Sequence, residues 1–174
     1  MKNGKAMGDG TSQQEKNDDG SDQFWDLIAL LDWDKLGDDD AVVEPVVAAL
    51  ARGPLSEIEA FEQTLSEKLY ELDTRAHAEN IGEQAYRGDE EAFSVDWFLY
   101  ARCVVVANGR ELFESLISTP SKMVQGLEFE ALLYIAANAW ERKTGDEMDF
   151  MATVSYETFS NETGWSSDKS NDTS

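Results

Sequence analysis

The fold is decided by residues 94–109, which read SVDWFLYARCVVVANG. Within this stretch residues 97–107 are apolar nearly all round, whereas a helix at a protein surface keeps one polar face. Ser94 stands where an N-cap is expected, and the Asn108-Gly109 pair is typical of a helix end or break. The sequence therefore predicts a central helix that the other elements surround.

Helical patterns lie on both sides of this segment. Phe24 to Leu31 has the apolar spacing of an amphipathic helix, and Ser56 and Glu59 have the spacing of a capping box. Phe150 to Phe159 nearly alternates between apolar and polar residues, which suggests a short extended segment lying on the helices, with Trp165 pinning its end. Further helices are expected over residues 41–52, 54–73, 74–81, 110–117 and 127–143.

These patterns predict a mainly all-α fold, a compact bundle of about five to seven helices with a short extended C-terminal segment. Residues 22–165 are long enough and apolar enough for a single domain. Residues 1–21 and 166–174 are rich in small polar side chains, so burial cannot repay their ordering entropy. We expect both segments to be disordered tails.

The chain is strongly acidic, with a formal net charge of -22. Residues 21–166 hold 30 of the 36 acidic residues and 10 of the 14 basic residues, so the charge belongs to the predicted domain. Such a surface repels nucleic acid and anionic membrane and attracts basic proteins or divalent cations. Two further explanations stay open, namely solubility alone and adaptation to high salt.

The predicted location is the cytoplasm. Residues 1–20 contain no apolar run of signal-peptide length, and no stretch approaches the roughly 20 apolar residues of a membrane-spanning helix. The single cysteine, Cys103, excludes an intrachain disulfide.

No catalytic site or cofactor is predicted. The only histidine, His77, lies in a charged helical segment without a nucleophile motif, so we expect it to be exposed or to cap a helix. Apolar neighbours favour a buried, inert Cys103. One cysteine and one histidine cannot build a structural zinc site, and the aspartate runs do not match a calcium loop.

A candidate interaction face is the remaining functional signal. Interfaces favour aromatic anchors with charged surroundings, and Trp33, Trp97 and Trp165 each lie beside or near carboxylates. Burial in the core is the commoner fate for Trp97 and Trp165, whereas Trp33 falls on a predicted connection between helices, where exposure is expected. The candidate residues are Asp32, Trp33, Asp34, Asp38, Asp39, Asp40, Asp96 and Trp97.

Several phrases of the sequence occur together in a known order. They are FW at residues 24–25, KLYELDT at 68–74, DWFLYARC at 96–103 running into VANG at 106–109, LEFEALLY at 127–134 and SYETFSN at 155–161. Together, over residues 22–165, they resemble a bacterial family known only as domain of unknown function 4240. The resemblance implies a helical bacterial intracellular domain and supplies no catalytic residue.

Two functions follow as hypotheses. The first is a non-catalytic protein-binding module that engages a basic partner, as an inhibitor or immunity protein would. The alternative is a hydrolase that uses surface carboxylates to hold a divalent metal ion. The absence of any enzyme motif favours the first.

Overall fold

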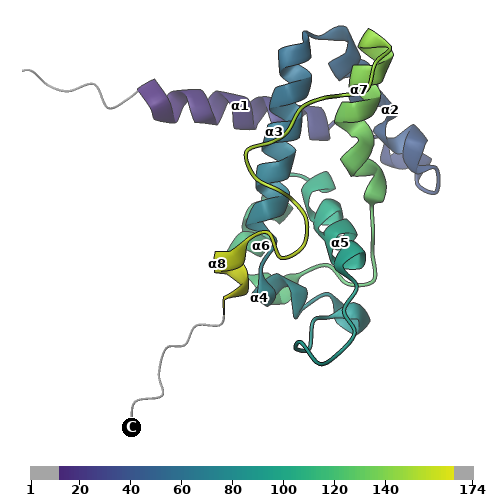
Figure 1. Cartoon of the computed structure of the whole chain (residues 1–174). Coiled ribbons are helices and arrows are strands. Elements are labelled where there is room, and N and C mark those ends of the chain that lie inside the picture. The colour runs from purple at the N-terminus through teal and green to yellow at the C-terminus, as the bar shows by residue number, and fades with distance from the viewer. Residues whose placement is uncertain (1–11, 167–174) are drawn as a thin grey trace, which may run out of the picture.

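The computed structural model describes residues 12–166, with side chains described from Gly20 onward. Within these residues the chain forms eight α-helices and four 3₁₀ turns and no strand, which confirms the predicted all-α class (Figure 1). The α-helices are α1 (Ser12–Ile28), α2 (Asp39–Arg52), α3 (Leu55–Glu71), α4 (Arg75–Ala78), α5 (Val95–Ala107), α6 (Arg110–Ser118), α7 (Ile135–Thr144) and α8 (Glu162–Trp165). The 3₁₀ turns are η1 (Trp33–Lys35), η2 (Gly82–Gln84), η3 (Pro120–Lys122) and η4 (Glu130–Tyr134).

Helix α5 is the central helix that the sequence predicts. Ser94 caps it, because the Ser94 Oγ accepts a hydrogen bond from the Trp97 backbone N–H at 3.2 Å. Every α5 residue from Phe98 to Ala107 is buried except the half-buried Tyr100. The helix ends before Gly109, whose φ of 93° suits a residue without a Cβ and lets the chain turn into α6.

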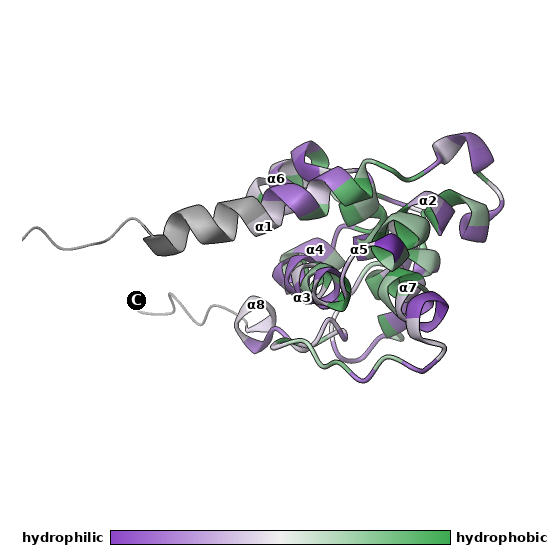
Figure 2. Ribbon diagram, turned by 90° about the horizontal axis from the view of Figure 1, so that it is seen from above, coloured by the Kyte–Doolittle hydropathy of each residue, from purple (hydrophilic) through white to green (hydrophobic). Residues whose placement is uncertain are grey.

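The apolar sides of the helices share one core with α5, which itself packs mainly against α3, α6 and η4. On α1 the rings of Phe24 and Trp25 lie 5.1 Å and 5.5 Å from those of Phe61 on α3 and Phe113 on α6. Helix α2 packs along α7. Figure 2 shows the apolar segments gathered where α2, α5 and α7 come together, with hydrophilic segments toward the outside. This arrangement buries the apolar stripes read from the sequence.

The N-terminal helix is longer than its apolar pattern indicates. Helix α1 begins at Ser12, inside the segment 1–21 for which the sequence predicts disorder, and ends at Ile28. Residues 1–11 and 167–174, also predicted to be disordered, lie outside the described residues.

Two local predictions are wrong. The proposed capping box of Ser56 and Glu59 does not form, because α3 already begins at Leu55 after Pro54, with no side-chain hydrogen bond at the cap. Residues 127–143 are not one helix either. The Phe129 backbone N–H instead donates to the Tyr100 carbonyl at 3.2 Å, and a 3₁₀ turn precedes α7. That path buries Phe129 against the core, which outweighs the local helical preference.

Residues 146–161 form an extended strap across the helices, coloured yellow-green in Figure 1. From Met148 to Phe159 the even-numbered residues are half-buried and the odd-numbered ones exposed, which confirms the predicted extended segment. The Gln63 side chain on α3 holds the strap, because its Oε1 accepts from the Thr153 N–H at 2.9 Å and its Nε2 donates to the Thr153 Oγ1 at 2.6 Å.

The strap ends on a buried carboxylate. Asp73 has no exposed surface and accepts hydrogen bonds from the backbone N–H groups of Phe159 and Asn161 and from the Trp165 indole, at 3.2, 3.0 and 2.8 Å. Trp165 therefore pins the C-terminal segment, as the sequence predicts. It does so from α8, a single turn that the sequence pattern does not reveal.

In the part of the chain that the structure describes, no helix is both long enough and apolar enough to cross a membrane.

Candidate functional site

Four of the eight candidate residues lie on the connection between α1 and α2, and two more, Asp39 and Asp40, open α2. Asp32 caps the turn η1 by accepting a hydrogen bond from the Asp34 N–H at 3.2 Å, and Asp38 caps α2 by accepting one from the Ala41 N–H at 3.1 Å. These caps fix the course of the connection and leave its acidic residues at the surface. We call this surface the Trp33 face, formed by Asp32, Trp33, Asp34, Asp38, Asp39 and Asp40.

Trp33 is the aromatic centre of this face. Its side chain is 38% exposed, and its ring centroid lies 5.4 Å from that of Phe129. One part of the indole therefore rests on a buried ring while the rest is open to solvent. Two exposed leucines, Leu30 and Leu36, extend the apolar surface around it. A tryptophan held in this way is a rigid contact surface with little side-chain entropy left to lose.

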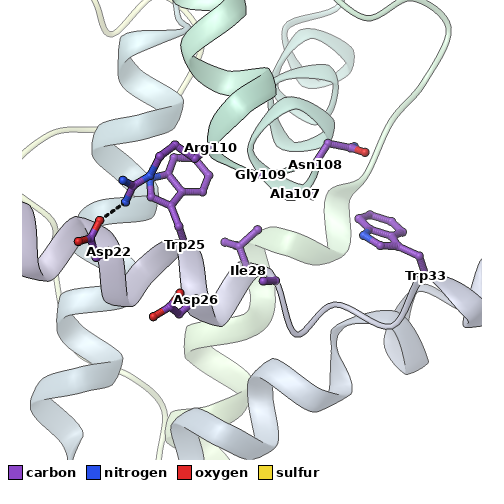
Figure 3. Close-up of a pocket in the computed structure, with 10 residues that line it drawn as sticks. Asp22, Trp25, Asp26, Ile28, Trp33, Ala107, Asn108, Gly109 and Arg110 are labelled. Carbon is purple, nitrogen blue, oxygen red and sulfur yellow. Dashed lines mark hydrogen bonds and ion pairs between the residues drawn. The ribbon is translucent and has the colours of Figure 1, made fainter.

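A pocket with a volume of about 540 Å³ adjoins Trp33. Figure 3 shows Trp33 on one side, Trp25 and Ile28 on α1 facing it, and the α5–α6 junction at Asn108 and Gly109 beside them. At the rim Asp22 on α1 pairs with Arg110 on α6. The Trp33 face thus adjoins an open pocket of mixed polar and apolar lining, whose acidic residues are Asp22 and Asp26 of α1.

The structure does not bring Asp96 and Trp97 to this face. Both lie in the first turn of α5, whereas Trp33 shares its pocket with residues 107–109 at the other end of that helix. Eleven residues of α-helix separate the two places, a distance of about 16 Å. Trp97 is half-buried and packs against the core, which is the commoner fate of a tryptophan. Asp96 is exposed and lines a different pocket.

That second pocket, which we call the tyrosine pocket, is not evident from the sequence. It has a volume of about 430 Å³ and lies where α3, α5, η4, α7 and the strap meet. Three tyrosines and four carboxylates line it, namely Tyr100, Tyr134, Tyr156, Glu62, Asp96, Glu130 and Glu157. Because these residues come from distant parts of the chain, no local motif marks them.

Glu62 is the unusual carboxylate of the tyrosine pocket. It lies on α3 four residues after the buried Ile58 and three before the buried Leu65, where the apolar stripe calls for another apolar residue. Burial raises the pKa of Glu62 to about 7. This misplaced acid is the one sequence signal that could have pointed to the pocket.

The tyrosines of the pocket stay protonated. Burial, with Glu130 as the next cause, raises the pKa of Tyr100 to about 12. Burial, followed by the charge of Glu62, raises the pKa of Tyr156 to about 12. The Tyr134 hydroxyl donates a hydrogen bond to Glu130. At neutral pH these groups therefore offer aromatic rings and hydroxyl oxygens and no charge.

His77 is buried, so the expectation of an exposed or capping histidine is wrong. Its side chain is 3% exposed, because Nδ1 lies 2.7 Å from the Thr74 Oγ1 and Nε2 lies 3.0 Å from the Leu116 carbonyl oxygen. Burial lowers the pKa of His77. The ring links α4 to α6, and Thr74, not His77, supplies the cap of α4.

Cys103 is fully buried, as predicted, and burial raises the pKa of its thiol to about 12. Among the described side chains, those of residues 20–166, no three His, Cys, Asp or Glu groups are placed so that they could hold a metal ion. The described residues therefore offer neither a reactive thiol nor a metal-ligand set on which a reaction could be built.

The described residues thus form an all-α fold in which an exposed tryptophan, Trp33, lies among aspartates between α1 and the first turn of α2. The chain belongs to the DUF4240 family of proteins of unknown function, whose family model matches residues 20–142. This confirms the family resemblance seen in the sequence. No curated protein and no solved structure matches the chain.

Proposed function

We propose that the protein is a non-catalytic binding module whose Trp33 face engages a basic partner protein. The observation that carries this proposal is the exposed Trp33, held on Phe129 beside an open pocket and bordered by carboxylates. Interface hot spots are typically aromatic anchors of this kind, surrounded by residues that exclude water.

Charge supports a basic partner. Residues 32–40 contain five aspartates and one lysine, and the whole chain carries a net charge of -22. Charge of one sign over a surface raises the rate of encounter with a partner of the opposite sign, and salt weakens this effect. The Trp33 face therefore suits association that is fast at low salt and slower as salt rises.

Proteins that act on nucleic acid form one partner class with the required charge, because phosphate binding needs a cationic cleft. An inhibitor or immunity-like role against such a protein is one form of the proposed function. The metal-dependent hydrolase has no comparable support, since no observation in the described residues favours it.

Affinity capture from cells that express the protein tests the proposal, with immobilised wild type compared with Trp33→Ala at low and moderate salt. Ile117→Ala on α6 is a matched control, because Ile117 is 37% exposed and Trp33 is 38% exposed. We expect one dominant basic protein, which is lost as salt rises and lost with Trp33→Ala but retained with Ile117→Ala. Capture that both variants retain would contradict the assignment of the interface.

A second pair of variants tests the contribution of the acidic charge to binding apart from that of Trp33. The triple variant Asp34→Asn, Asp39→Asn and Asp40→Asn should reduce the association rate and its salt dependence while leaving the dissociation rate nearly unchanged. The control neutralises three exposed acids of the strap region, Asp146, Glu147 and Asp149. Equal effects of the two triple variants would show that only total charge matters and would refute a localised acidic interface.

A further inference from the structure

We propose that the tyrosine pocket binds an organic ammonium cation, the protonated amine either of a free alkylamine or of a lysine side chain. This site is distinct from the Trp33 face, because the two pockets share no lining residue. It therefore stands or falls independently of the function proposed above.

The walls of the tyrosine pocket suit the two halves of such a ligand. The side chains of Leu99, Leu133, Met148 and Phe150 provide apolar surface for an aliphatic stem. The rings of the three tyrosines attract a cation through their quadrupoles, and their hydroxyl oxygens can accept N–H hydrogen bonds. At about 430 Å³ the pocket is within the size range of small-ligand sites.

The charge of the pocket is one-sided. Four carboxylates line it, and none of its lining residues, all within the described chain, is Lys, Arg or His. Glu130 receives the Tyr134 hydroxyl hydrogen bond. Glu62, in contrast, makes no hydrogen bond or ion pair with any described residue, and burial alone raises its pKa. A cation in the pocket would give this carboxylate a partner that no described residue provides.

The spacing of the carboxylates favours an organic cation over a metal ion. No three acidic, histidine or cysteine side chains in residues 20–166 come close enough together to coordinate a metal. An ammonium group needs no such convergence, because it can satisfy its three N–H donors with one carboxylate and neighbouring hydroxyl oxygens. The pocket supplies both kinds of acceptor.

Binding should be coupled to proton release from Glu62. The groups that line the pocket with Glu62 are Asp96 and Tyr100 from α5, Glu130 and Tyr134 from η4, and Tyr156 and Glu157 from the strap. None of these side chains can carry a positive charge, so no lining residue competes with a bound cation for Glu62. Because a bound cation favours ionised Glu62, the affinity for the cation should rise as pH increases from 6 to 8. The rise should be up to about tenfold for each unit by which the bound ligand lowers the pKa of Glu62.

Isothermal titration calorimetry of the full chain tests this site with two probes, cadaverine for a free alkylamine and Nα-acetyl-lysine methylamide for a lysine side chain. The titrations are done at moderate salt, which weakens the non-specific attraction of the cationic probes to the acidic surface. We expect saturable binding at one site per chain, tighter at pH 8 than at pH 6, with proton release that appears as a dependence of the heat on the buffer. The probe that binds more tightly identifies the source of the amine.

Glu62→Gln should weaken binding at pH 8 and remove both the pH dependence and the proton release. Glu147→Gln is the matched control, because Glu147 is an exposed residue near the strap that does not line the pocket. Tyr134→Ala provides a second test that leaves the core intact, since Tyr134 is 50% exposed, and it should weaken binding at both pH values. Absence of saturable binding, or equal weakening by Glu62→Gln and Glu147→Gln, would overturn the proposal.

Discussion

Replacing Glu62 by glutamine should stabilise the folded protein above neutral pH and have little effect at pH 5. Burial raises the pKa of Glu62 from its ordinary 4.5 to about 7, so the native state holds a proton that the unfolded chain has already released between these values. The free energy of unfolding therefore falls progressively as pH rises above 4.5. The full loss, which comes from ionising Glu62 in the native state, is present above about pH 7.

The size of the effect follows from the shift. A displacement of roughly 2.5 pKa units corresponds to about 3 kcal/mol, and a glutamine that keeps the volume but carries no charge should recover about 1–3 kcal/mol of it at pH 8. At pH 5 the native acid is still protonated and only the first part of the cost is present, so the two proteins should differ by less than about 1 kcal/mol.

Urea denaturation at pH 5, 6, 7 and 8, followed by tryptophan fluorescence, measures this difference. Glu147→Gln serves as the control and should follow the wild type at every pH, because Glu147 is exposed. A Glu62→Gln difference that does not change with pH would refute the reasoning. So would a loss of stability at pH 8, because it would mean that ionised Glu62 is stabilised by contacts in the native state.

Three further predictions concern buried polar groups. Asp73→Asn should destabilise the fold by about 2–4 kcal/mol in urea denaturation, because Asp73 accepts three hydrogen bonds from the C-terminal segment. The control Asp149→Asn, at an exposed position on the strap, should change the free energy of unfolding by less than about 0.5 kcal/mol. Cys103 should not react with a thiol reagent in the native protein and should react fully in denaturant, since burial raises its pKa to about 12; rapid native labelling would contradict its burial. Because burial lowers the pKa of His77, the contribution of His77 to folding stability should be lost as pH falls below about 6.5. An NMR titration of this single imidazole should show a midpoint below about pH 6.5. A midpoint at or above that pH would contradict the buried position.

The central part of the fold could be predicted from the sequence because its signals are local. The uninterrupted apolar character of residues 97–107 predicts α5, the N-cap at Ser94 predicts its start, and Cys103 follows as a buried thiol. The alternation after Phe150 likewise predicts the extended strap. In each case one short segment contains the whole pattern, so no tertiary contact is needed to interpret it.

The failed predictions concern places where tertiary contacts override local preference. Residues 127–129 favour a helix by composition but are extended, because the Phe129 backbone bonds to Tyr100 and its ring is buried. The Ser56 capping box fails because α3 begins at Leu55, two residues before the start that a Ser56 N-cap requires. His77 is buried by α6, an element 33 residues later in the chain that local sequence does not place beside it.

The candidate site was predicted only in part for the same reason. The run from Asp32 to Asp40 is contiguous in sequence, and each of its residues is at least partly exposed. Asp96 and Trp97 share its composition but lie at the other end of α5, because composition does not reveal which helix end meets which connection. The tyrosine pocket draws on five segments and could be recognised only from the structure, apart from the misplaced acid at Glu62.

The most direct test of the account is site-specific photocrosslinking from the Trp33 face in cells that express the protein. A photoreactive residue at Leu36, which is 79% exposed beside Trp33, should crosslink to one basic protein, and added Trp33→Ala should abolish that product. The same residue at Ile117 on α6 should give no such product. A crosslinked partner that is acidic, or one captured equally from Leu36 and Ile117, would contradict the claim that this face binds a basic protein.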